Sequence, residues 1–157
     1  SLIVIGGGVA NSPDLLLATI RETIYRRSLP LATRDLLVQR SSLGGLVSFY
    51  IGRRNPLTFG KAAGMSSSFW WNDQALTVTV EQSTTHVPVN FYIDAGTSSD
   101  GLTYTTRMKN ALTVDGYVQG RDLYYYVASG GSHSEASWSA RLHVPLQYLF
   151  PWQSTAY

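Results

Sequence analysis

The sequence predicts an α/β protein in which a mostly parallel sheet carries helices on both faces. Short apolar runs rich in Val, Ile, Leu and Tyr alternate along the chain with longer segments of helical periodicity. Strands that alternate with helices typically form such a three-layer sandwich. The 157 residues are 44% hydrophobic and 14% charged, which is enough apolar material for one compact core. No internal repeat or linker interrupts the chain, so residues 1–157 are predicted to form a single domain.

The amino-terminal part is predicted to begin with a buried strand at residues 2–5, which ends at three glycines. A helix should start at Ser12-Pro13-Asp14, because a capping residue is followed there by a proline in the first helical position and by an acid that suits the helix dipole. Pro30 ends this helix, and residues 35–39 read as the next strand. The chain has no initiator Met, which suggests that it begins inside a longer one.

The rest of the chain continues the alternation. Leu46, Val47 and Tyr50 lie on one face of an expected helix, and the segment VPVNFYI is rich in β-branched and aromatic residues that favour a strand. Pro145 is a candidate kink in the last helix. The expected elements are a helix at 44–52, strands at 61–67 and 87–93, a helix at 103–114, a strand at 123–128, a glycine-rich loop at 129–133 and a helix at 135–150.

Composition argues against several classes of function. The net charge is +2, and the basic residues are scattered instead of forming the stripe that nucleic-acid binding needs, so no nucleic-acid partner is expected. The absence of cysteine excludes disulfides, thiolate catalysis and cysteine-based zinc sites. No run approaches the roughly 20 apolar residues of a membrane span. The composition favours no particular compartment, and association with a second copy of the chain stays open.

Three loops could carry chemistry, since active residues of open parallel sheets lie beyond the carboxyl ends of the strands. Ser42 follows the expected strand at 35–39, Asp94 and Asp100 follow the strand at 87–93, and His133 follows the strand at 123–128. The order of serine, acid and histidine is the one used by α/β-hydrolases.

Ser42 lies in the segment Arg40-Ser41-Ser42-Leu43-Gly44, which matches the G-x-S-x-G pattern at the serine and at the second glycine. A sharp turn there would expose the hydroxyl and point the following amide at a reacting carbonyl oxygen. Arg40 replaces the first glycine. The alternative is an ordinary Ser/Gly turn that caps a helix.

His133 could accept the serine proton and return it to the leaving alcohol, because it follows a strand and precedes a helix. A surface loop histidine is the alternative. His86 precedes a strand and His143 lies inside a helix, so both are assigned to structure or solvent. Asp100 is preferred as the acid because a glycine-rich excursion gives it reach toward His133, while Asp94 stays the second candidate, with a turn-holding role as its alternative.

Several separated motifs together resemble a known family. They are residues 41–46 (SSLGGL), 66–73 (SSSFWWND), 92–97 (YIDAGT), and 133–138 (HSEASW) followed by Arg141 and residues 149–151 (LFP). Over roughly residues 33–152 the chain resembles the esterase family that includes esterase D, feruloyl and acetyl-xylan esterases and siderophore esterases. This resemblance implies the α/β-hydrolase fold, no cofactor, and hydrolysis of a small, carbohydrate-linked or siderophore ester through an acyl-enzyme.

The resemblance also implies roles for individual residues. Ser42 would be the nucleophile, His133 the general base and acid, and Asp100 the third member of the triad. The amide of Leu43 would supply an oxyanion donor. Trp70 and Trp71 would line the substrate pocket, with core packing as their alternative role.

Two departures from the family leave a rival function open. Arg40 brings a charged side chain to a crowded turn, and only one strand and one helix precede the strand at 35–39, where a complete α/β-hydrolase has several. The chain would then be a fragment, a shortened homologue, or a subunit completed by a partner. A catalytically impaired relative that acts as a binding or interaction module is the alternative. A nucleotide site at glycines 6–8 is less favoured, because the third glycine and the distal acid of that motif are missing.

Overall fold

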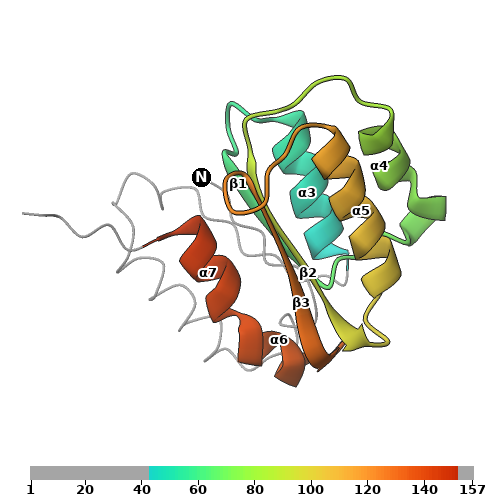
Figure 1. Ribbon diagram of the computed structural model, residues 1–157, viewed down its shortest axis with the longest axis vertical. Coiled ribbons are helices and arrows are strands. Elements are labelled where there is room, and N and C mark those ends of the chain that lie inside the picture. The colour runs from blue at the N-terminus through green and yellow to red at the C-terminus, as the bar shows by residue number, and fades with distance from the viewer. Residues whose placement is uncertain (1–42, 152–157) are drawn as a thin grey trace, which may run out of the picture.

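The computed structural model describes residues 43–151 (Figure 1). Its elements are α3 (Gly44–Arg54), β1 (Lys61–Met65), α4 (Trp71–Glu81), β2 (Asn90–Ser98), α5 (Leu102–Val114), β3 (Leu123–Ser132), α6 (Glu135–Arg141) and α7 (His143–Leu149). The strands predicted at 2–5 and 35–39, the helix predicted from Ser12, and the residues Arg40 and Ser42 lie outside the described range. None of the helices described is long and apolar enough to cross a membrane.

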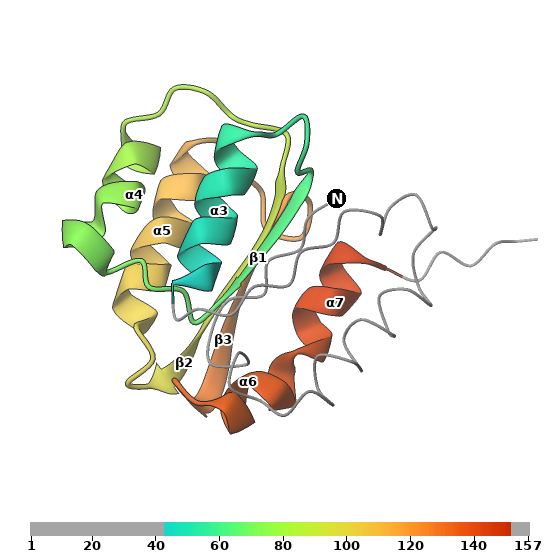
Figure 2. The same cartoon turned by 180° about the vertical axis from the view of Figure 1, so that it is seen from behind.

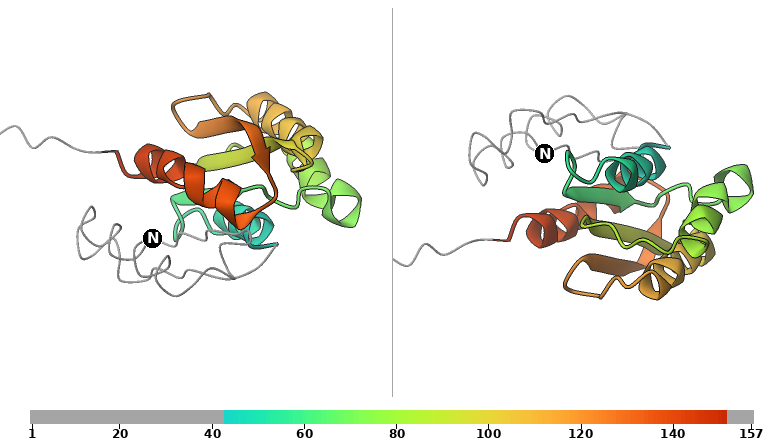
Figure 3. Two further views of the ribbon diagram at one scale, coloured as in Figure 1. Left: turned by 90° about the horizontal axis from the view of Figure 1, so that it is seen from below. Right: turned by 90° about the horizontal axis from the view of Figure 1, so that it is seen from above.

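The three described strands form a parallel sheet in the order β1-β2-β3. Helices α3, α4 and α5 cover one face of this sheet, while α6 and α7 cover the other (Figures 2 and 3). Side chains alternate along β2 accordingly: Phe91 and Ile93 pack with α3 and α5, and Tyr92 packs with α6 and α7. Two apolar clusters, one on each face, therefore hold the sheet between the helices. The predicted three-layer α/β architecture is confirmed.

Helix α4 has no counterpart in the sequence prediction. Its first residues, Asn72, Asp73 and Gln74, all have positive φ values of 49°, 51° and 63°, so the regular helix starts only after a left-handed turn. Only Thr77 and Val80 are buried along it. An element with so few buried positions and several β-branched residues has a weak helical periodicity, which explains why the pattern did not reveal it.

The predicted final helix is in fact two helices, which meet at Leu142. Pro145 explains the break, because it has no N–H to donate to the carbonyl of Arg141 and its ring would clash with that carbonyl. In the structure Pro145 lies in the first turn of α7, where a proline is tolerated. The short helix α6 that results carries Trp138 and Arg141 on its buried side.

The predicted loop at 129–133 is wrong in its extent, because β3 continues to Ser132. Strand β2 likewise runs on to Ser98, beyond the predicted end at Ile93. The two strands stay paired there because Gly96 and Gly131 lack side chains. A Cβ built on Gly96 would lie 2.1 Å from the carbonyl oxygen of Gly131. Glycines that look like loop residues in the sequence thus allow a close approach of two strands.

Candidate active site

The candidate site lies at the carboxyl ends of the three strands, where a hollow of about 320 Å³ opens to solvent. The turn after β1, the turn after β2 and the residue after β3 all contribute to it. We call it the strand-end hollow, and its lining includes Ser66, Ser67, Trp70, Asp100, Tyr104 and His133. Parallel strands bring their carboxyl ends to one edge, so residues far apart in the sequence meet here.

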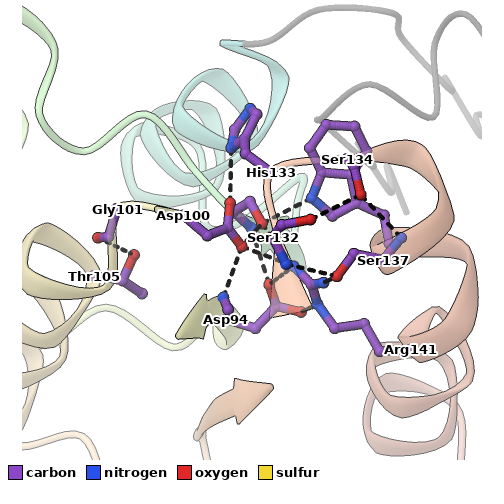
Figure 4. Close-up of polar contacts among 12 residues, drawn as sticks. Asp94, Asp100, Gly101, Thr105, Ser132, His133, Ser134, Ser137 and Arg141 are labelled. Carbon is purple, nitrogen blue, oxygen red and sulfur yellow. Dashed lines mark hydrogen bonds and ion pairs between the residues drawn. The ribbon is translucent and has the colours of Figure 1, made fainter. Parts of the chain in front are cut away.

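His133 and Asp100 form the central contact of this site. The Nδ1 atom of His133 lies 2.8 Å from Oδ1 of Asp100 (Figure 4). The Asp100 residue is only 3% exposed, whereas the His133 side chain is 39% exposed. A carboxylate on Nδ1 favours the tautomer with its proton on that nitrogen, which leaves Nε2 as the proton acceptor. The pair has the geometry of a general base with its orienting acid.

The other oxygen of Asp100 is held by three donors. Oδ2 accepts hydrogen bonds from the backbone N–H of Gly96 at 2.6 Å, from the hydroxyl of Ser66 at 2.5 Å and from Nη2 of Arg141 at 3.2 Å. Local backbone geometry aims the carboxylate inward, since Ser99 and Gly101 on either side have positive φ values of 52° and 71°. The carboxylate is therefore fixed before any substrate binds.

Asp94, the alternative acid, makes a different set of contacts. Its two oxygens accept from Nε and Nη2 of Arg141 at 3.0 and 3.1 Å, from the hydroxyl of Tyr92 at 2.7 Å and from the N–H of Ser66 at 2.9 Å. No described contact joins Asp94 to His133. The structure thus brings Asp100, and not Asp94, to the imidazole.

Burial affects the protonation of the groups around Asp94. Burial first, and then the charge of Asp94, raises the pKa of Tyr92 far above its ordinary value, so this phenol remains a hydrogen-bond donor. Burial acts to lower the pKa of Arg141, but the hydrogen bond and charge of Asp94, followed by the charge of Asp100, outweigh it and raise that pKa. The guanidinium is a permanent cation in the site.

Ser66, Arg141 and Tyr104 are site residues that the sequence reasoning missed. Ser66 has a φ of 46° and uses its hydroxyl fully, because it donates to Asp100 and accepts from Nη2 of Arg141 at 2.6 Å and from Nε1 of Trp138 at 2.8 Å. The run of three serines directly after a small-residue strand was the available signal for Ser66. Arg141 was visible only as part of the family motif, and nothing in the sequence singled out Tyr104.

The start of α3 packs tightly against the end of β1. A Cβ on Gly45 would lie 2.2 Å from Oγ of Ser67 and 3.1 Å from Cα of Gly64. Only a residue without a side chain fits at this position of α3. Leu43 directly precedes α3, at the helix end whose dipole favours negative charge. Ser42, the preceding residue, lies outside the described range.

The two neighbouring tryptophans point to different places. Trp70 is 51% exposed and lines the strand-end hollow. Trp71 is 48% exposed and lies along a second hollow of about 340 Å³ between α3 and α4, beside Val47 and Tyr50. Core packing, the alternative role for both, is wrong. Among the two, only Trp70 lies at the candidate site.

The other histidines and acids between residues 43 and 151 form no second candidate site. His86 stacks on Tyr117 with ring centroids 4.2 Å apart and lies 3.6 Å from Asp122, before β2 and away from the strand-end hollow. His143 is the first residue of α7 and is exposed. Within residues 43–151, no group of three or more His, Asp or Glu side chains is arranged to hold a metal ion.

One family model matches most of the chain. The model of the family described as "Putative esterase" matches residues 26–149. A solved ferulic acid esterase is similar with a TM-score of 0.63 and 14% identity, over 95% of this chain and 84% of that one. No curated protein matches the chain.

Two structures of the enterobactin esterase FES from Shigella flexneri are also similar. The one with 2,3-di-hydroxy-N-benzoyl-glycine has a TM-score of 0.59 and 18% identity, over 95% of this chain and 53% of that one. The one with enterobactin has a TM-score of 0.57 and 20% identity, over 95% and 52%. The chain thus spans about half the length of these enzymes, and at such identities the likeness shows the α/β fold. Since the family model covers more than half of the chain, the chain belongs to this family of ester hydrolases.

Proposed function

We propose that the chain is a serine carboxylic-ester hydrolase with Ser42 as nucleophile, His133 as general base and Asp100 as the group that orients it. The hydrogen bond of 2.8 Å between His133 and the buried Asp100 carries this proposal. It leaves Nε2 of His133 to take the proton of Ser42 as the hydroxyl attacks the ester carbonyl. We further propose that residues 1–157 form one domain.

In the proposed reaction, attack by Ser42 gives a tetrahedral intermediate whose oxyanion accepts a hydrogen bond from the amide of Leu43. His133, now cationic, donates its proton to the leaving alcohol, and an acyl-enzyme remains. Water then attacks this acyl group while His133 takes its proton, and His133 returns that proton to Oγ of Ser42 as the acyl bond breaks and the acid product leaves. Asp100 stabilises the imidazolium in both halves without being protonated itself.

The proposed substrate is a small ester with an aromatic or sugar group. Trp70 and Tyr104 line the strand-end hollow, and their side chains are 51% and 38% exposed. Exposed aromatic rings stack on flat aromatic groups and on the apolar faces of sugars. Feruloyl esters, carbohydrate-linked esters and siderophore esters all fit this description.

Covalent labelling tests the nucleophile directly. We expect an aryl phosphonate ester to modify one residue, Ser42, as identified by mass spectrometry of peptides, and we expect labelling to require His133. The variant His86→Gln is the matched control, because its side chain is as exposed as that of His133, at 39%, but lies outside the hollow. It should label at the wild-type rate. Labelling elsewhere, or none in a folded wild-type protein that binds esters, would favour the binding-module alternative.

The adjacent tryptophans provide a test of substrate recognition. We expect Trp70→Ala to raise KM for an aromatic ester such as methyl ferulate about tenfold, since a lost stacking contact of about 1.4 kcal/mol corresponds to that factor. Trp71→Ala removes an equally exposed ring that does not line the strand-end hollow, so KM should change less than twofold. Equal effects of the two substitutions would contradict the assignment of Trp70 to the substrate site.

A further inference from the structure

A second buried carboxylate lies directly behind the Asp100–His133 pair. Arg141 joins the two acids, because its Nε and Nη2 atoms donate to both oxygens of Asp94 while Nη2 also lies 3.2 Å from Oδ2 of Asp100 (Figure 4). Asp94, Asp100 and Arg141 are all buried. Charges so placed interact more strongly than charges in water and are little screened by salt.

The charges of this cluster do not cancel while His133 is neutral. Apart from the imidazole of His133, the described polar partners of the two carboxylates are all N–H and O–H groups that donate to their oxygens. Two negative charges then face the single positive charge of Arg141. A cationic His133 brings the sum to zero.

Other titratable groups around the cluster do not alter this sum. Tyr92, next to Asp94, stays a hydrogen-bond donor because burial raises its pKa, Tyr126 lies nearby on β3, and Tyr104 lines the hollow from α5. Glu135 lies in the first turn of α6 and is exposed. The one negative charge that stays uncompensated at rest is therefore available to the imidazolium of His133.

The guanidinium of Arg141 is oriented toward Asp94. A fork of two N–H groups matches both oxygens of that carboxylate, which is the strongest arrangement for this pair of groups. Nη1 donates to Oγ of Ser137 at 2.7 Å, and Nη2 donates to Oγ of Ser66 at 2.6 Å. These contacts hold the fork on Asp94 and leave Asp100 with only one N–H of the guanidinium, at a longer distance.

We propose that Asp94 is a positioning residue for catalysis. Its negative charge compensates the positive charge of Arg141, so that the charge of Asp100 can stabilise the protonated His133. The inference rests on the proposed function, because it assumes that His133 becomes cationic during the reaction. Asp94 touches neither substrate nor His133, and its effect passes through Arg141 and Asp100.

The test is Asp94→Asn, which removes the charge and keeps the shape. The positive charge of Arg141 then compensates the negative charge of Asp100, so the cationic form of His133 is stabilised less. We expect the acid limb of the kcat/KM profile for p-nitrophenyl acetate to move to lower pH by about one unit and the plateau of kcat to fall about tenfold. The imidazole resonances of His133, followed by NMR against pH, should show the same displacement without any need for turnover.

Arg141→Gln is the second variant, and its expected effect has the opposite sign. Without the cation, the negative charge around His133 grows, so the acid limb and the NMR titration of His133 should move to higher pH. This opposite displacement distinguishes the proposal from a loss of structure, which would lower activity in both variants without moving their titrations in opposite directions. Circular dichroism establishes that each variant is folded, and Arg141→Gln decides the matter if Asp94→Asn does not fold.

Asp115→Asn is the matched control. Asp115 is also a buried carboxylate paired with an arginine, since Oδ2 lies 2.7 Å from Nη1 of Arg53, but it lies at the opposite end of α5 from Asp100. Its substitution should leave the titration of His133 in place. A folded Asp94→Asn variant with unchanged titration and acid limb would overturn the inference. A wild-type protein that hydrolyses no ester, or a fully active Ser42→Ala variant, would instead overturn the proposed function.

Discussion

Replacement of Asp100 by asparagine is expected to lower kcat about ten-thousand-fold while the protein stays folded. Three donors surround Oδ2 of Asp100, so the amide oxygen of the asparagine should take that place and its NH2 group should face His133. The imidazole would then have to accept at Nδ1 and carry its proton on Nε2. In that tautomer His133 cannot accept the proton of Ser42.

The measurement is steady-state hydrolysis of p-nitrophenyl acetate, together with thermal unfolding of both proteins. Stability should change little, because Arg141 keeps its fork on Asp94 in the variant. Asp122→Asn is the control, since Asp122 is the carboxylate nearest to the other paired histidine, His86, at 3.6 Å. It should retain activity within twofold. A loss smaller than tenfold in the Asp100 variant would mean that Ser42 and His133 work without a third member.

Replacement of Gly96 by alanine is expected to destabilise the protein by about 3 kcal/mol, at the upper end of the usual cost of overpacking. The added Cβ would lie 2.1 Å from the carbonyl oxygen of Gly131 and 2.2 Å from its carbonyl carbon, and backbone atoms cannot move aside as a flexible side chain can. Strands β2 and β3 must therefore separate at the end that carries Asp100 and His133. A displacement of about 1 Å between these two residues costs about 100-fold in kcat.

Urea unfolding followed by circular dichroism measures this loss. Gly60→Ala is the control, because a Cβ at that glycine meets no atom within 4 Å, and its free energy of unfolding should stay within about 0.5 kcal/mol of the wild type. A Gly96→Ala variant as stable as Gly60→Ala would show that β2 and β3 are farther apart at their ends than described. If Gly96→Ala kept its free energy of unfolding but lost activity, the substitution would disturb the active site without separating the two strands.

Local patterns in the sequence accounted for most of the described fold. Apolar runs rich in β-branched and aromatic residues predicted β2 and β3, and helical periodicity predicted α3 and α5. The buried face of α3 differs from the expected one, because Val47 and Tyr50 are 44% and 51% exposed while Phe49 is buried. Helix α4 was not predicted, because it buries only Thr77 and Val80 and so has a weak helical periodicity. The carboxyl ends of β2 and β3 were predicted too early along the chain. The glycines there favour turns in isolation, but in this sheet they allow the two strands to approach closely.

The sequence alone determined which residue types were available for chemistry and the order in which they occur along the chain. It favoured Asp100 over Asp94 for its reach, but it could not identify the contacts that separate the two acids. His133 lies 33 positions from Asp100, and Arg141 lies 75 positions from Ser66. Such partners meet only because parallel strands end at one edge of a folded sheet. The fixed carboxylate, the fork of Arg141 on Asp94 and the different surroundings of Trp70 and Trp71 are therefore properties of the packed molecule.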